Sequence, residues 1–138
     1  MKLDVILRVT TKAILPFILL FALYVHFHGD FGPGGGFQAG VIAAGMVILY
    51  AIVFGVEAAQ RVVPQWLVSA MVPIGVLVYG GTGVISFIFG ANYLDYSILA
   101  HDPKHGHHLG ILLVEAGVIT TVAGTMTAIF YAFVQRGR

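Results

Sequence analysis

One carboxylate lies well inside an apolar stretch, and its position makes it the first candidate for ion chemistry. Glu115 comes five residues after Gly110, where the last apolar run begins, so it lies roughly 8 Å along a helix that starts there. A charge inside a membrane is costly, and such residues normally face a protein interior or water. Two interpretations stay open for Glu115: a proton or cation site, and a hydrogen-bonded structural glutamate.

Two further acidic residues are candidates for an ion path. Asp30 lies in a glycine-rich segment, where backbone amides could cap it or where it could face an ion route. Glu57 ends the second apolar run, four residues before Arg61. Opposite charges at that spacing commonly pair on a helix, so an ion pair at a helix end is the favoured interpretation of Glu57.

A histidine-rich segment lies between the last two apolar runs and contains His101, His105, His107 and His108. Two histidines four residues apart on a helix can bind zinc. Pro103 and Gly106 make a helix unfavourable here, and no glutamate is placed as in an H-E-x-x-H motif. We therefore expect an external, solvated loop without a metal; a metal site and pH sensing by the imidazoles are the alternatives.

The glycine-rich segment lies between the first two apolar runs. It has five glycines between Gly29 and Gly36, around Pro33. No helix can run straight through it, because glycine is conformationally free and proline fixes its own backbone angle. It lacks the lysine of a phosphate-binding loop, so we expect a tight turn that feeds a closely packed helix. The residues expected to form this turn and its packing surface are Pro33, Gly34, Gly35, Gly36, Phe37 and Gly40.

The composition places these groups in a membrane. Hydrophobic residues make up 59% of the chain and charged residues 9%, whereas about a quarter of the residues of a soluble domain are charged. A net charge of +1 without a basic stripe argues against nucleic acid as a partner. The chain has no cysteine, so it has neither disulfides nor thiolate metal sites.

Four apolar runs are each long enough to cross a bilayer, which takes about 20 apolar residues. We therefore predict an all-α, polytopic membrane protein that forms a single transmembrane domain over residues 1–138. The expected spans are about 13–28, 37–57, 65–89 and 110–134. Pro73 lies inside the third span and should kink it.

The basic residues predict the orientation. One lies on the side of the histidine-rich segment, Lys104, and six lie on the side of the termini: Lys2, Arg8, Lys12, Arg61, Arg136 and Arg138. Short loops rich in lysine and arginine stay cytoplasmic. We therefore expect both termini in the cytoplasm and the glycine-rich turn outside.

The fourth span has two faces that need protein neighbours. A stripe of small residues occupies one face, at Gly117, Thr121, Gly124 and Ala128. Glu115 points to nearly the opposite face, since two helical residues are about 200° apart. Four helices from one chain rarely enclose their own outer helix, so this pattern implies partner subunits.

No nucleophile–base pair, cofactor fingerprint or metal cluster is recognisable, so we expect neither an enzyme nor a cofactor. The segment PGGGFQAG at residues 33–40, just after the first span, resembles the signature of the B subunit of Mrp-type multisubunit Na⁺/H⁺ antiporters, the MnhB-like family. The segment GVISFIFG at residues 83–90 is similar to the same family.

The resemblance implies a small integral membrane subunit of a monovalent cation/proton antiporter that is driven by the proton-motive force and contributes to pH homeostasis. Such a subunit would brace or line an ion path in a bacterial or archaeal cytoplasmic membrane. Its partners would be other hydrophobic subunits, and Na⁺ and H⁺ would be the transported ions. The alternative is a structural membrane subunit of a related redox-driven complex, such as a membrane-bound hydrogenase.

Overall fold

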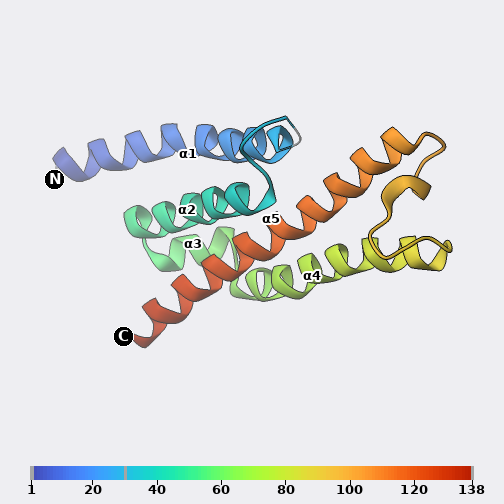
Figure 1. Ribbon diagram of the computed structural model, residues 1–138. Helices are drawn as coiled ribbons and strands as arrows, with labels where there is room; N and C mark the ends of the chain where they lie inside the picture. The colour runs from blue at the N-terminus through green and yellow to red at the C-terminus, as the bar shows by residue number, and fades with distance from the viewer. Residues whose placement is uncertain (1, 30, 138) are drawn as a thin grey trace.

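Four long helices make up most of the chain (Figure 1). The computed structural model describes residues 2–29 and 31–137, with side chains from Asp4 onward. The elements in chain order are α1 Lys2–His28, α2 Gly36–Phe54, α3 Val56–Val62, α4 Gln65–Ile88, the 3₁₀ helix η1 Tyr96–Ile98, and α5 Pro103–Arg136. Helices α1, α2, α4 and α5 are long and apolar enough to cross a membrane. The all-α, four-span prediction is confirmed.

The four long helices run in alternating directions, so the two chain ends lie at the same end of the bundle (Figure 1). The short helix α3 also lies at that end, and the α1–α2 turn and the η1 segment lie toward the other. The side of the membrane on which each end lies stays a prediction from the lysine and arginine count.

Helix α5 is the centre of the bundle and packs on two faces. Its small-residue face lies on α4: a methyl group built at Gly117 would come 2.7 Å from the carbonyl oxygen of Gly75. Its other face lies on α2: a methyl group built at Gly40 would come 2.7 Å from Cβ of Val122. The two-face prediction is confirmed, but the reason for invoking partners was wrong. Helices α2 and α4 of the same chain supply both neighbours (Figure 1).

Helix boundaries differ from the expected spans where local backbone chemistry intervenes. Helix α2 ends at Phe54, because Gly55 has φ +99°, a conformation that favours glycine. The expected connection after Glu57 is largely helical, as α3. Helix α5 begins at Pro103 rather than near residue 110.

The contact between Gly75 and α5 gives a stability prediction. A methyl group built at Gly75 would come 2.7 Å from the amide nitrogen of Thr121 and 2.5 Å from the carbonyl oxygen of Gly117. Backbone atoms cannot move aside cheaply, so Gly75→Ala should destabilise the fold by about 1–3 kcal/mol, the usual cost of overpacking. Thermal unfolding of the purified protein, followed by size-exclusion chromatography, measures this loss.

The matched control for Gly75→Ala is Gly80→Ala on the same helix. A methyl group built at Gly80 meets nothing within 4 Å, and alanine favours a helix over glycine by about 1 kcal/mol. We expect Gly80→Ala to leave the melting temperature unchanged or to raise it. Equal melting temperatures for the two variants would contradict the close α4–α5 contact.

Candidate functional site

The turn between α1 and α2 folds back onto the last turns of α1. The amide of Gly35 donates to the carbonyl of Val25 at 3.1 Å, and the amide of Phe31 donates to that of His28 at 3.0 Å. Gly35 has φ +124°, which an L side chain rarely adopts. The next residue begins α2, so the amino end of that helix is held against the carboxyl end of α1.

The carboxylate of Glu115 lies directly on this turn. A methyl group built at Gly29 would come 2.9 Å from Glu115 Oε1, and one built at Gly35 would come 3.2 Å from it. Glu115 is half-buried. Because α5 begins at Pro103, Glu115 lies about 18 Å from the start of the helix at 1.5 Å per residue, farther than the apolar run alone indicated.

The amino end of α2 offers this carboxylate a favourable electrostatic environment. The first amide groups of a helix have no partner within the helix, and the helix dipole is positive at that end. Gly35 is the N-cap of α2 and has no side chain to occupy the position. The arrangement therefore stabilises negative charge on Glu115 where hydrocarbon would penalise it.

The structure does not bring the other acidic candidate that it describes, Glu57, to the turn beside Glu115. Asp30 lies outside the described residues. Glu57 is exposed in the first turn of α3, at the opposite end of α2 from the turn (Figure 1). Glu57 therefore does not share a site with Glu115, and its ion pair with Arg61 stays a prediction.

His26 belongs to the same region, although its sequence context singled out no role for it. It lies on α1 and is only 6% exposed. Its Nδ1 atom is buried and has no hydrogen-bond partner among the described residues. His26 lies three residues before Gly29, close to the end of α1 at His28, and a methyl group built at Gly29 would come 2.9 Å from Glu115 Oε1. In the sequence, the signal that could have identified His26 is its position three residues before Gly29.

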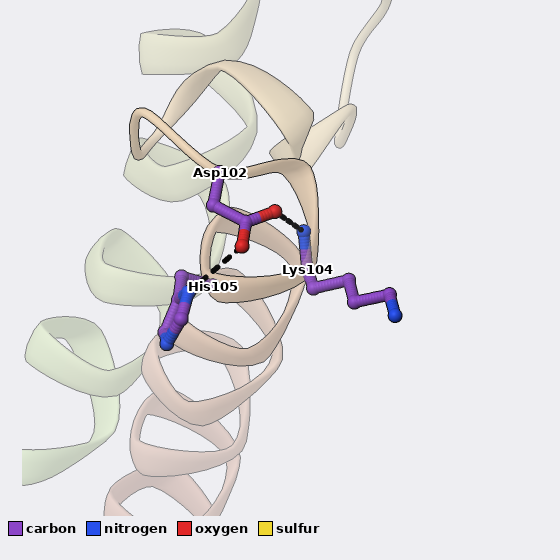
Figure 2. A network of polar contacts seen from close by, with 3 residues as sticks. All are labelled: Asp102, Lys104 and His105. Atoms are coloured by element: carbon purple, nitrogen blue, oxygen red, sulfur yellow. Dashed lines mark hydrogen bonds and ion pairs between the residues drawn. The ribbon is translucent and has the colours of Figure 1, made fainter.

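The histidine-rich segment corrects one prediction. We expected a loop, but α5 starts at Pro103 and includes His105, His107 and His108. Proline is favourable at the first position of a helix, where its missing amide costs nothing. The carboxylate of Asp102 caps this helix, accepting from the Lys104 amide at 3.2 Å and lying 3.3 Å from His105 Nδ1 (Figure 2).

Gly106 is also compatible with the helix. It is buried against the carbonyl oxygen of Tyr96, so the η1 segment passes where a side chain would stand. His105 points to solvent, with 81% of its side chain exposed. Within the described residues, no three His, Cys, Asp or Glu side chains are grouped so that they could hold a metal ion. pH sensing by these imidazoles stays a prediction.

Hydrogen bonding at Asp95 shapes the connection before α5. Its carboxylate accepts from the Ser97 hydroxyl at 2.6 Å and from the Ser97 amide at 3.1 Å. These two hydrogen bonds, the side-chain one foremost, lower the pKa of Asp95 from its ordinary value. The hydrogen bonds that the Asp95 carboxylate accepts from Ser97 are therefore present at neutral pH. They are lost only as the pH falls through the lowered pKa of Asp95.

Comparisons with known proteins agree on one family. Residues 6–128 match the family described as "Domain related to MnhB subunit of Na+/H+ antiporter". A Staphylococcus haemolyticus (strain JCSC1435) protein named "Putative antiporter subunit mnhB2" is 33% identical over 132 residues, covering 94% of this chain and 93% of the relative. A protein of the same name from Staphylococcus aureus (strain MRSA252) is 36% identical over 129 residues, covering 86% and 91%.

Proposed function

Because this chain belongs to the MnhB family of Na⁺/H⁺ antiporter subunits, we propose that it is an integral membrane subunit that lines an ion path at Glu115 and braces that path with its glycine-rich turn. Four membrane-spanning helices and bacterial relatives make it a multi-pass protein of the cell membrane. The transported ions, the proton-motive force as driving force, and the role of Glu115 are parts of the proposal.

The observation that carries the proposal is the position of the Glu115 carboxylate on the turn, beside the amino end of α2. A carboxylate can bind a proton or a monovalent cation, and occupancy by one excludes the other. The Glu115 carboxylate lies on the turn that joins α1 to α2, so this turn is where a proton and a cation would compete.

The redox-driven alternative is less favoured. The two relatives described above are named as antiporter subunits, and neither name mentions a hydrogenase or a redox cofactor. The exposed hydrophobic side chains of the described helices fit either kind of complex. Phe17 and Leu20 on α1 and Leu77 on α4 are each at least 60% exposed, so other hydrophobic subunits or lipid must cover them.

A purification through this chain tests the proposed assembly. The complex is extracted from native membranes in a mild detergent, and the proteins that come with the tagged chain are identified by mass spectrometry. We expect a set of hydrophobic subunits without hydrogenase or flavin subunits. We also expect that everted vesicles lose Na⁺/H⁺ exchange when the gene for this chain is deleted. Co-purifying redox subunits, or exchange that survives the deletion, would contradict the proposal.

His26 gives a second test of the same site. His26→Gln keeps hydrogen-bonding atoms but cannot titrate. We expect it to slow exchange several-fold and to change the pH dependence of the rate, because His26 is buried near the end of α1 that leads into the turn on which Glu115 lies.

The control for His26→Gln is His28→Gln. His28 lies on the same helix end but stacks on Tyr24, with ring centroids 5.2 Å apart. Its replacement should change the pH profile less. Indistinguishable pH profiles for wild-type protein and His26→Gln would remove His26 from the ion path. Asp30, the other nearby titratable group in the sequence, is best left unchanged in both variants.

A further inference from the structure

A groove separates α1 from α2 at the end of the bundle that carries the termini. It has a volume of about 380 Å³ and an almost wholly apolar wall that includes Leu15, Leu19, Met46 and Val47. Helix α3 borders one end of the groove through Ala59 and Val62. The groove lies where α3, which follows Gly55, folds back under α2.

One charged side chain lines this groove. Lys12 is exposed, and its Nζ lies 5.5 Å from the centre of the Phe54 ring, within cation–π range. The ring therefore holds the ammonium group between α1 and the end of α2. Arg8 lies one helical turn before Lys12, and Arg61 occupies the last turn of α3.

We propose that this groove binds one acyl chain of an anionic phospholipid, whose phosphate is held by Lys12. Basic residues beside pockets between transmembrane helices are a recurring means of binding anionic headgroups. The acidic side chains described at this end, Asp4 and Glu57, are both exposed. Trp66, at the start of α4, is 72% exposed, and tryptophan is typical of the headgroup level of a membrane.

The size and charge of the groove favour a lipid over a partner helix. A helix with its side chains is about 10 Å wide and would have to lie over the mouth of this groove, whereas one hydrocarbon chain can lie within its volume of about 380 Å³. A comparable groove of about 420 Å³ between α2 and α5, lined by residues such as Val41 and Met126, has no charged side chain in its wall. This uncharged groove between α2 and α5 supplies the control for the lipid-binding experiment.

A photoreactive lipid tests the assignment on the assembled complex. The complex is reconstituted into nanodiscs that contain phosphatidylglycerol or phosphatidylcholine with the same diazirine-bearing acyl chain, and the labelled peptides are mapped by mass spectrometry. We expect phosphatidylglycerol to label the groove wall around Met46 about fivefold more than phosphatidylcholine does, as one lysine near an anionic lipid contributes about 1 kcal/mol. Lys12→Gln should remove that difference.

Matched variants separate the groove from the rest of the surface. Met46→Trp fills the groove and should abolish its labelling, whereas Met126→Trp in the uncharged groove and Lys104→Gln at the other end should not. Equal labelling by the two lipids, or labelling that survives Lys12→Gln unchanged, would overturn the assignment.

A partner subunit in the groove is the other outcome that would overturn the proposal. The chain has no cysteine, so Met46→Cys introduces a single thiol that can carry a benzophenone label. Cross-linking of that label to another subunit in the assembled complex would show that protein occupies the groove. Cross-linking to lipid supports the proposal. Neither result depends on whether Glu115 carries ions.

Discussion

Replacing Glu115 with glutamine should reduce Na⁺/H⁺ exchange by about tenfold or more while the complex still assembles. Interactions with a charged group contribute about 1.5–3 kcal/mol, and 1.4 kcal/mol corresponds to a factor of ten in affinity. Glutamine has nearly the same shape, so the space over Gly29 and Gly35 remains filled. The variant removes the negative charge and little else.

The measurement is the rate of Na⁺/H⁺ exchange in everted vesicles, with the amount of assembled complex determined in the same membranes. Glu57→Gln is the matched control, because Glu57 is exposed in α3 at the other end of α2. We expect that control to exchange normally. Wild-type exchange by Glu115→Gln would exclude the carboxylate from the ion path and leave this chain a bracing role only.

Gly35→Leu should prevent the chain from entering the complex. Gly35 has φ +124°, and a side chain in that conformation costs of the order of 1–3 kcal/mol. Its first side-chain atom would also stand 3.2 Å from Glu115 Oε1, so a leucine would push the carboxylate off the turn. Both effects act on the junction that joins α1, α2 and α5.

Incorporation is measured by co-purification of this chain with its partner subunits and by blue-native electrophoresis. Gly45→Leu inside α2 is the control, because a methyl group built at Gly45 meets nothing within 4 Å and its φ is not positive. Gly35→Ala should give an intermediate loss, since it keeps the strain but adds less bulk. Normal incorporation of the Gly35→Leu chain into the complex would contradict the bracing role of the turn.

Much of the architecture follows from local chemistry that can be read along the chain. The four spans follow from apolar runs separated by charged or glycine-rich segments. The PGGGF segment cannot continue a helix, and its Gly35 does occupy a conformation that favours glycine. The small-residue stripe that includes Gly117 predicted a close contact with another helix, and the backbone of α4 lies against this stripe.

Two misjudged features depended on contacts distant in the sequence. Gly106 counted against a helix, yet it is needed there because the Tyr96 carbonyl lies where its side chain would be. Pro103 likewise counted as a breaker, although Asp102 makes it the first residue of a capped helix. In both cases a residue type was weighed without its position relative to the helix end.

The sequence by itself determined the membrane environment, the number of spans and the lone carboxylate of the last span, because each depends on the solvation of side chains in a local window. Only the tertiary structure decided that α5 lies between α2 and α4, that Glu115 rests on Gly29 and Gly35, and that His26 is buried. Those contacts join segments up to 86 residues apart, Gly29 and Glu115. Helical periodicity indicates which face of a helix must be covered, but not which other helix covers it.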